Sequence, residues 1–326
     1  MKAVIPLAGL GTRLRPHTLS RPKPLVFVAG KPVLGHVLDR LEGLPIDEMI
    51  FITGYLGEQI EHYVRATYPF KARFVEQREL KGQAHAIHLA REFIDEPLLI
   101  VFVDTIFEAD LSKLQTLEGD GAIFVKEVKD PRRFGVAVVE DDHVARLVEK
   151  PRTPVSNLAV VGVYYLKDWK LFVECLDELL ERDIKTQGEY YLADALQLMI
   201  DRGAKLRAFP IEVWEDTGTP EALLETNRYL LRGRSVDVEG ETRDSKIIPP
   251  VDAAPGCKIV NSIVGPNVSI ASGAIVLNSI IRDSIVGEGA QVSGAVLADS
   301  IVGNNALIEY SPRRLNVSDY SQIEQA

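Results

Sequence analysis

Apolar and polar residues alternate in two distinct patterns along residues 1–234. Short apolar runs typical of buried strands occur at residues 2–8, 49–55, 72–77 and 98–104. Between these runs, apolar residues three and four positions apart predict amphipathic helices over residues 33–44, 56–68 and 84–94. Strands that alternate with helices favour a largely parallel sheet covered on both faces, with ligands at the carboxyl ends of the strands.

The next apolar runs follow one another with no long helix between them. They cover residues 122–128, 135–140 and 157–166. Part of the sheet is therefore expected to be antiparallel. Helical spacing returns at residues 169–182 and 220–233, where the Leu and Phe stripes are expected to face the core.

The pattern changes at about residue 235, where the helical periodicity ends. The string SIVG begins at Ser262, Ser284 and Ser300, and SIIR begins at Ser279. Aliphatic residues recur every six positions, as at Val264, Ile270 and Val276. Such a hexapeptide pattern predicts a parallel β-helix of about three coils, with a structural role. The chain thus divides into an α/β domain at residues 1–234 and a β-helix domain at residues 235–326.

Composition limits the classes of function. The 326 residues are 46% hydrophobic, which suits two domains, and the net charge of −10 argues against a nucleic-acid surface. No apolar run approaches the roughly 20 residues of a membrane helix, and no leader is seen, so no membrane partner and a cytoplasmic location are expected. Cys175 and Cys257 form no disulfide framework and are expected to be buried thiols. Of the histidines, only His85 and His88 have a spacing that could suit a metal, and a structural role is favoured for them.

The strongest chemical signal is the string VIPLAGLGTRLRP at residues 4–16, followed by PKPL at residues 22–25. Ala8, Gly9 and Gly11 allow the backbone to turn tightly after the first strand and to bring its N–H groups close to a ligand. Arg13 and Lys23 add positive charge, which indicates a phosphate site. The string matches neither a Walker A loop nor the dinucleotide fingerprint.

The longer string at residues 4–41 closely resembles the signature of the sugar-1-phosphate nucleotidylyltransferases. Over nearly the whole chain, including RRLNVSDYS at residues 313–321, the closest likeness is to glucose-1-phosphate thymidylyltransferases that carry a β-helix tail. The resemblance implies a Rossmann-like nucleotidyltransferase domain with a mixed sheet, followed by a short left-handed parallel β-helix. It also implies direct, in-line transfer of a nucleotidyl group from an NTP to a sugar 1-phosphate, without a Ser, Cys or His nucleophile.

Two carboxylates match the family positions that hold the catalytic metal. Asp104 follows the apolar run 98–103, and Asp216 precedes the turn that leads into the helix at residue 220. From the residues alone, each is as readily a turn or capping residue. The resemblance implies that they bind Mg²⁺, whose preferred ligands are carboxylate and phosphate oxygens. The family usually has Gly before the first of these Asp residues, whereas this chain has Val103.

The resemblance also assigns the residues that bind the two substrates. Gln77 and Gly82 match positions that read a pyrimidine, which favours dTTP or UTP. The implied catalytic residues are Arg13, Lys23, Asp104 and Asp216, with Arg13 on the departing pyrophosphate and Lys23 nearer the α-phosphate. The implied nucleotide site comprises Leu7, Ala8, Gly9, Gly11, Thr12, Arg13, Lys23, Gln77 and Gly82. The implied site for the sugar phosphate, expected to be glucose 1-phosphate, comprises Gly135, Glu149, Lys150, Asn157, Val160 and Gly162.

Other functions stay open at this point. The loop at residues 13–25 also resembles mannose-1-phosphate guanylyltransferases, and a nucleotide-sugar-binding regulatory paralogue without turnover is an alternative. An acyltransferase acting through the β-helix is disfavoured, because residues 257–308 contain no His to act as a base. A homo-oligomer is expected, because the aliphatic ladders of the coils suit packing on neighbours.

Overall fold

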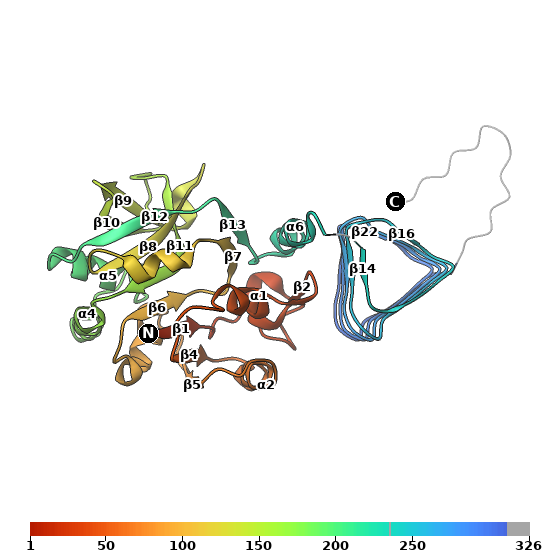
Figure 1. Ribbon diagram of the computed structural model, residues 1–326, viewed down its shortest axis with the longest axis horizontal. Helices are drawn as coiled ribbons and strands as arrows, with labels where there is room; N and C mark the ends of the chain where they lie inside the picture. The colour runs from red at the N-terminus through yellow and green to blue at the C-terminus, as the bar shows by residue number, and fades with distance from the viewer. Residues whose placement is uncertain (235, 312–326) are drawn as a thin grey trace. The chain divides into compact units, whose positions relative to one another are not determined.

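The computed structural model describes residues 1–234 and 236–311 (Figure 1). It forms two compact units, Met1–Thr226 and Asn227–Ala326. The sequence suggests a boundary after residue 234 instead, which remains a proposal. The RRLNVSDYS string at residues 313–321 lies outside the described residues.

The first unit is built on a nine-stranded sheet in the order β5-β4-β1-β6-β11-β8-β12-β10-β9. Parallel pairing joins β1 to β4 and β6, β4 to β5, and β8 to β12. Antiparallel pairing joins β11 to β6, β8 and β9, and β10 to β9 and β12. The sheet is therefore mixed, as expected. Its strands are β1 (Lys2–Pro6), β4 (Glu48–Thr53), β5 (Ala72–Glu76), β6 (Leu98–Val101), β8 (Gly121–Glu127), β9 (Gly135–Glu140), β10 (His143–Glu149), β11 (Leu158–Leu166) and β12 (Leu206–Pro210).

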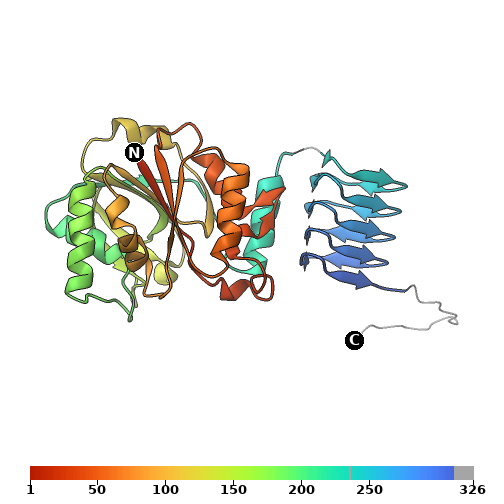
Figure 2. The same ribbon diagram turned by 90° about the horizontal axis from the view of Figure 1, so that it is seen from below.

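Helices lie on both sides of this sheet (Figure 2). One core contains fully buried side chains of the central strands, such as Ile100, together with Ile87 and Phe172 of the helices that cover them. The helices are α1 (Val33–Arg40), α2 (Gly57–Thr67), α3 (Gln83–Leu89), α4 (Trp169–Glu181), α5 (Leu192–Asp201) and α6 (Pro220–Leu231). Short 3₁₀ helices are η1 (Thr12–Leu14), η2 (Lys23–Leu25), η3 (Arg91–Phe93), η4 (Leu111–Thr116) and η5 (Pro131–Arg133).

The apolar run at residues 98–104 does not form one strand. Strand β6 ends at Val101, and the amide of Phe102 donates to the carbonyl of Gly162 at 2.9 Å. Gly162 has a φ of 88°, and β11 shifts its register against β8 between Val160 and Tyr164. This irregularity ends the regular ladder and starts the separate strand β7 (Thr105–Glu108), which pairs with β13 (Val213–Asp216). A second two-stranded sheet joins β2 (Phe27–Val28) to β3 (Lys31–Pro32).

The second unit is a left-handed parallel β-helix with a triangular cross-section (Figure 1). Its three sheets contain five, five and four strands. The expected three coils were too few, because the first coil lacks the SIVG string and has polar, exposed residues at Glu241–Arg243. Its strands are β14 (Val236–Val238), β15 (Glu241–Arg243), β16 (Lys246–Ile247), β17 (Val251–Ala253), β18 (Lys258–Val260), β19 (Ile263–Val264), β20 (Val268–Ile270), β21 (Ile275–Leu277), β22 (Ile280–Arg282), β23 (Ile285–Val286), β24 (Gln291–Ser293), β25 (Val296–Ala298), β26 (Ile301–Val302) and β27 (Leu307–Glu309).

The repeated serines of the β-helix connect successive coils. Ser262 Oγ accepts from the amide of Ser279 at 3.1 Å, and Ser279 Oγ accepts from the amide of Ala295 at 3.1 Å. Ser279 Oγ also donates to the carbonyl of Leu277 at 2.6 Å. Each serine therefore satisfies backbone groups at a corner, where the sheet hydrogen bonds are interrupted.

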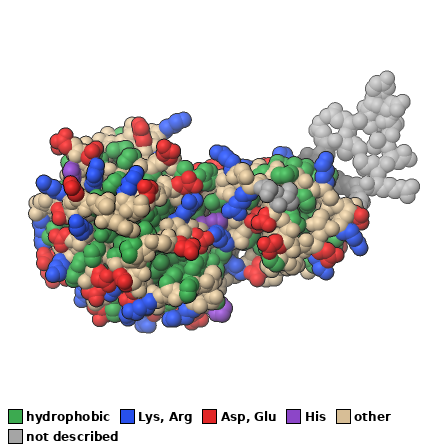
Figure 3. Space-filling view, viewed as in Figure 1, with side chains coloured by type: hydrophobic (Ala, Val, Ile, Leu, Met, Phe, Trp, Pro, Cys, Tyr) green, Lys and Arg blue, Asp and Glu red, His purple; other side chains and the backbone are tan. Residues whose placement is uncertain are grey.

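Both cysteines are buried, free thiols, as expected. In the described parts of the chain, no helix has the length and apolar character needed to span a bilayer. On the face drawn in Figure 3, Lys and Arg side chains are interspersed with Asp and Glu.

Candidate active site

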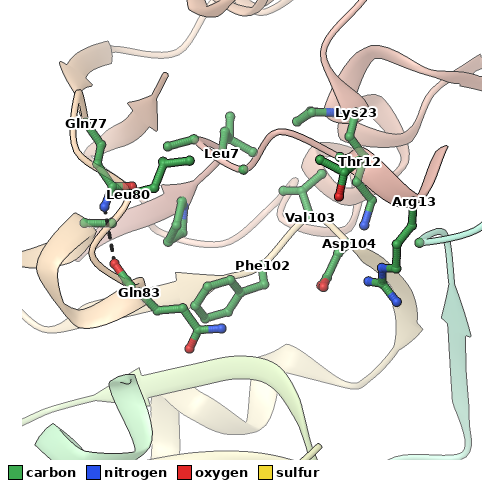
Figure 4. Close-up of a pocket in the computed structure, with 18 of the residues that line it drawn as sticks. Leu7, Thr12, Arg13, Lys23, Gln77, Leu80, Gln83, Phe102, Val103 and Asp104 are labelled. Carbon is green, nitrogen blue, oxygen red and sulfur yellow. Dashed lines mark hydrogen bonds between the residues drawn. The ribbon is translucent and has the colours of Figure 1, made fainter. Parts of the chain in front are cut away.

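A cavity of about 360 Å³ opens beside the carboxyl end of β1 in the first unit. Ten of the residues expected from the sequence line it: Leu7, Ala8, Gly9, Gly11, Thr12, Arg13, Lys23, Gln77, Gly82 and Asp104. Figure 4 shows Arg13, Lys23 and Thr12 on the same side of this pocket as Asp104, with Gln77 at the other side. The cavity therefore combines cationic side chains, a carboxylate and an amide.

The loop after β1 requires glycine at position 11. Gly11 has a φ of 61°, and a Cβ there would lie 3.0 Å from Lys23 Cβ and 3.1 Å from Thr18 Cγ2. Its carbonyl accepts from Thr18 Oγ1 at 2.8 Å and from the amide of Leu14 at 3.0 Å. Only glycine combines this backbone conformation with so close a contact, so the loop lies directly against the base of the Lys23 side chain.

The strand pair β7–β13 brings Asp104 and Asp216 together. Asp216 pairs with Thr105, and the carbonyl of Asp104 accepts from both N and Oγ1 of Thr217. Asp216 Oδ1 accepts from the amide of Gly218 at 2.7 Å. Asp216 does not itself line the cavity, whereas Gly218 does.

Glycine at position 218 allows Arg13 to approach Asp216. A Cβ at this position would lie 2.8 Å from Asp216 Oδ1 and 2.9 Å from Arg13 Nη2. The Arg13 guanidinium and the Asp216 carboxylate thus both lie next to the α-carbon of Gly218. The resulting cluster has alternating charges at the edge of the cavity.

Lys23 lies between charges of both signs. Burial lowers the pKa of its ammonium group below the ordinary lysine value, the carboxylates of Asp104 and Asp216 oppose this shift, and Arg13 adds to it. The ammonium group of Lys23 is therefore within electrostatic range of both carboxylates. A bound phosphate would add further negative charge and favour the protonated amine.

The chemistry of the donor set suits a hard divalent cation. Asp104 and Asp216 are both exposed, and carboxylate oxygens are the preferred protein ligands of Mg²⁺. Within residues 1–234 and 236–311, no group of three or more His, Cys, Asp or Glu side chains is arranged to hold a metal. Mg²⁺ typically takes one or two carboxylates together with substrate phosphates, so two carboxylates beside a phosphate loop fit it.

Gln77 and Gly82 lie on the opposite wall. Gly82 has a φ of 111°, and a Cβ there would lie 2.4 Å from the carbonyl oxygen of Tyr190. The amide of Ala84 donates to the same carbonyl, and the amide of Tyr190 donates to the carbonyl of Lys81. The segment that contains Tyr190 is therefore held against the start of α3, and glycine is required where the two backbones meet.

The residues expected to bind the sugar phosphate are outside the lining of this cavity. Glu149 pairs with Gly135 across β9 and β10, and a Cβ at Gly135 would lie 2.8 Å from Glu149 Oε2. Lys150 Nζ lies 3.6 Å from Glu149 Oε1 and donates to the hydroxyl of Tyr191 at 2.9 Å. Burial raises the pKa of Glu149, while Lys150 opposes the shift. The three expected residues 135, 149 and 150 are therefore neighbours.

The other three residues expected around the sugar lie along or just before β11. Val160 and Gly162 are in this strand, and the carbonyl of Asn157 accepts from the amide of Val128. Gly162 contacts Phe102, which lines the cavity. The carboxylates of Glu149 and Asp104 both raise the pKa of the buried Tyr164 hydroxyl, after the larger effect of burial. Glu149 and Asp104 are therefore both within electrostatic range of Tyr164.

Sequence reasoning missed several residues of the site. Leu80, Gln83, Phe102, Glu189 and Gly218 line the cavity. Val103, noted in the sequence only as a departure from the family pattern, lines it too and is almost fully buried. The available signal for Glu189 was the string QGEYY at residues 187–191. In this string an acidic residue and two aromatic residues follow a glycine, as is common in functional loops.

Comparison with known proteins identifies relatives of the first unit and of part of the β-helix. A family model described as nucleotidyl transferase matches residues 2–233. The bifunctional protein GlmU of Methanocaldococcus jannaschii is 39% identical over 254 residues, covering 76% of this chain and 59% of that protein. The chain thus spans less than two thirds of that relative's length. A glucose-1-phosphate thymidylyltransferase of Streptomyces griseus is 32% identical over 317 residues, covering 89% of this chain and 88% of that protein.

A solved structure is similar as well. The crystal structure of a putative glucose-1-phosphate thymidylyltransferase from Bacillus anthracis, in complex with a sucrose, matches with a TM-score of 0.62 and 25% sequence identity. The match covers 72% of this chain and 97% of that chain.

Proposed function

The chain belongs to the nucleotidyl transferase family and is a sugar-1-phosphate nucleotidyltransferase, and we propose that it joins dTTP or UTP to glucose 1-phosphate. The products are the NDP-sugar and pyrophosphate. One observation carries the proposal: a single cavity is lined by the glycine loop after β1, by Arg13 and Lys23, and by Asp104. The Streptomyces griseus relative, named a glucose-1-phosphate thymidylyltransferase, supports the choice of sugar and of dTTP.

The phosphate side of the reaction is assigned to the loop and its cations. We propose that the N–H groups of Ala8, Gly9, Gly11 and Thr12, on the loop that begins at Leu7, bind the triphosphate. Arg13 would bind the departing pyrophosphate bidentately, and Lys23 would lie nearer the α-phosphate. The position of Lys23 between two carboxylates and Arg13 supports its assignment.

Asp104 and Asp216 are proposed as the protein ligands of Mg²⁺. Enzymes of this family generally use a divalent metal, which offsets the charge that develops on the α-phosphate during in-line displacement. The chain's contribution is to hold both carboxylates at one edge through the hydrogen bonds of Thr217. The resulting geometry leaves space beside Asp104 for phosphate oxygens.

Gln77 and Gly82 are proposed to bind the pyrimidine. The proposed sugar-phosphate site contains Gly135, Glu149, Lys150, Asn157, Val160 and Gly162, of which Glu149 accepts from sugar hydroxyls and Lys150 pairs with the phosphate. The contact between Gly162 and the cavity residue Phe102 supports placing this group next to the nucleotide.

A turnover assay tests the proposal. The full chain is incubated with Mg²⁺, each of dTTP, UTP, GTP, CTP and ATP, and a panel of sugar 1-phosphates, and pyrophosphate release is measured. The highest kcat/KM is expected for dTTP or UTP with glucose 1-phosphate. GTP with mannose 1-phosphate as the best pair would replace the specificity, and nucleotide binding without turnover on any pair would favour a regulatory protein.

A homo-oligomer and a cytoplasmic location belong to the same proposal. Ile263, Ile280 and Val296 are aligned on adjacent strands of one β-helix sheet, and all three side chains are exposed. An aliphatic row of this kind suits burial against a second copy. Sedimentation velocity tests this, since a monomer at micromolar concentration would contradict it.

A reaction that consumes a nucleoside triphosphate suits the cytoplasm.

A further inference from the structure

The side-chain amide of Gln77 has two partners inside the protein. Its nitrogen donates to the carbonyl of Gly82 at 3.3 Å and lies 3.2 Å from Nδ1 of His85. The residue is only 5% exposed. Figure 4 shows this nitrogen on the dashed line and the amide oxygen on the side of Leu80, which also lines the cavity.

The Gly82 carbonyl fixes which end of the amide faces which partner. A carbonyl oxygen only accepts, so the amide nitrogen must face it and the amide oxygen must face away. The same nitrogen then donates its second hydrogen to His85, whose Nδ1 must carry a lone pair. His85 is therefore the neutral tautomer with its hydrogen on Nε2.

This arrangement leaves a defined pair of groups for a base. Both hydrogens of the Gln77 amide are in use, and Gln77 Oε1 accepts no hydrogen bond from the residues that the structure describes. The amide N–H of Gly82 also donates to no partner within the described residues. Gly82 and Gln77 both line the cavity, so the groups left for a base are one side-chain acceptor and one backbone donor, and not the donor and acceptor of a freely turning amide.

We propose that His85 is a positioning residue that selects the base by holding the Gln77 amide with its oxygen toward the pocket. The proposal rests on the proposed function, since it deepens the role of Gln77 there. The acceptor Gln77 Oε1 and the donor Gly82 N–H match a base edge that carries an N–H next to a C=O. Uracil and thymine have this edge at N3, and guanine has it at N1.

Cytosine and adenine have the opposite pattern. Their central ring nitrogen is an acceptor, and it would face Gln77 Oε1 without a hydrogen between them. Leaving two acceptors together in a closed site is costly, which is how a built hydrogen-bond site rejects an analogue. The fixed amide thus excludes CTP and ATP by repulsion between acceptors. Discrimination between pyrimidines and guanine would then depend on the size of the cavity.

The surroundings of His85 favour its neutral form. Burial lowers the pKa of the imidazole, Lys81 and His88 add to this, and Glu79 opposes it. The ring of Tyr190 stacks on the imidazole with the ring centroids 6.5 Å apart. No carboxylate among the described residues is hydrogen-bonded to this ring, so protonation gains no partner.

Protonation of His85 weakens the selection. With a hydrogen on Nδ1, the imidazolium donates to the amide oxygen of Gln77 and competes with the Gly82 carbonyl for its orientation. In the fraction of molecules in which the amide turns, its nitrogen faces the base and suits the N3 acceptor of cytosine. Discrimination between UTP and CTP therefore falls as the pH decreases through the lowered pKa of His85.

Equilibrium binding of UTP and CTP to the full chain, measured by titration calorimetry with Mg²⁺, tests this. The wild type is expected to prefer UTP on the order of 100-fold, and His85→Ala reduces that ratio about tenfold, because one of two hydrogen bonds that hold the amide is lost. His85→Asn restores much of the ratio, because its carbonyl can accept. His88→Ala is the matched control on the same helix, bonded to Asp177 instead, and leaves the ratio unchanged.

The pH dependence separates positioning from a structural role. Between neutral pH and pH values below the His85 pKa, the UTP-to-CTP ratio falls in the wild type and stays level in His85→Ala. Using the ratio cancels the ionisation of the triphosphates themselves. An unchanged ratio in His85→Ala, or equal binding of UTP and CTP by the wild type, would overturn the proposal.

Turnover measured on the same proteins distinguishes the two claims. If the wild type turns over nucleotides while His85→Ala keeps the full UTP-to-CTP ratio, only the role of His85 fails. If the ratio changes as expected while no nucleotide and sugar phosphate are joined, only the proposed reaction fails.

Discussion

The backbone carbonyl of Asp104 accepts two hydrogen bonds from Thr217, one from N at 3.0 Å and one from Oγ1 at 2.9 Å. These bonds join the end of the central sheet to the strand that carries Asp216. The two carboxylates are thereby held at one edge mainly through the backbone, and the Asp216 side chain adds a hydrogen bond from the Gly218 amide, which the side-chain oxygen of an Asn can also accept. Substitution of either carboxylate can therefore test its chemistry without loosening the strands.

We expect Asp104→Asn and Asp216→Asn each to lower turnover on the order of 100-fold or more, since each removes a negative charge from the proposed Mg²⁺ site at nearly constant volume. Pyrophosphate release measured over a range of Mg²⁺ concentrations checks this. Glu108→Gln is the matched control, because Glu108 ends the strand β7 that directly follows Asp104, and it pairs with Arg40. Turnover within a few-fold of the wild type in both Asn variants would remove the assignment.

Lys23→Ala and Arg13→Ala should lower kcat far more than they raise KM for the sugar phosphate, because both cations act on the triphosphate. Since burial lowers the pKa of Lys23 in the unliganded protein, kcat/KM for the NTP should fall with rising pH below the ordinary lysine range, as the ammonium group loses its proton. In Lys23→Arg this alkaline decrease should disappear, because a guanidinium stays charged. An alkaline decrease retained in Lys23→Arg would assign it to another group.

At acid pH, the change of KM for the sugar phosphate with pH should report the protonation of Glu149. Burial raises its pKa, so it takes up a proton at a higher pH than an ordinary carboxyl group as the pH decreases. The proton occupies the acceptor that would bind a sugar hydroxyl, and KM for the sugar phosphate rises while KM for the NTP does not. Glu149→Gln should raise this KM at all pH values and abolish the trend, whereas Glu140→Gln, at the exposed end of β9, should change neither. An acid trend that persists in Glu149→Gln would refute the assignment.

Gly82→Ala should lower both stability and nucleotide affinity. The new Cβ would lie 2.4 Å from the Tyr190 carbonyl, and a φ of 111° is unfavourable for alanine. Gly203→Ala is the control, since Gly203 has a φ of 94° but no atom within 4 Å of its Cβ position. Gly203→Ala should cost about 1–2 kcal/mol of unfolding free energy for its backbone alone, and Gly82→Ala should cost more. Equal costs in denaturant titrations would show that Tyr190 moves away without penalty.

Ser279→Ala should destabilise the β-helix by about 1–3 kcal/mol, because the amide of Ala295 loses its acceptor in a buried corner. Ser272→Ala removes an exposed hydroxyl bonded to the carbonyl of Pro255 and should cost less than about 0.5 kcal/mol. Thermal unfolding gives both values. Turnover should be unchanged in both, and its loss in a folded Ser279→Ala protein would imply that the β-helix contributes to catalysis.

Local patterns accounted for most of the elements and for one wall of the cavity. The helix at residues 56–68 was expected from spacing alone and appears as α2 (Gly57–Thr67). Gly11 and Lys23 were expected to act together, and both line the cavity, since they belong to the same stretch of chain between β1 and β2. These features depend on short-range sterics and on hydrophobic periodicity, which a single sequence carries directly.

Features that depend on distant segments could not be found in this way. The split of the run 98–104 into β6 and β7 results from the irregular backbone of β11 at Gly162. The hydrogen bond between Gln77 and His85 joins a strand end to a helix, and neither residue alone indicates it. Glu189 enters the cavity only because the Tyr190 backbone bonds to the segment that contains Gly82. Such contacts are set by tertiary packing, which propensity does not encode.

The hydrogen bonds between Asp104 and Thr217 also bear on how the protein is made. They join positions 113 residues apart, so the loop between them must close before both carboxylates face one another. A nascent chain that has emerged from the ribosome only as far as α5 has the glycine loop and its cations but not the second carboxylate. During synthesis, the residues proposed to bind the triphosphate therefore leave the ribosome before the second proposed metal ligand does.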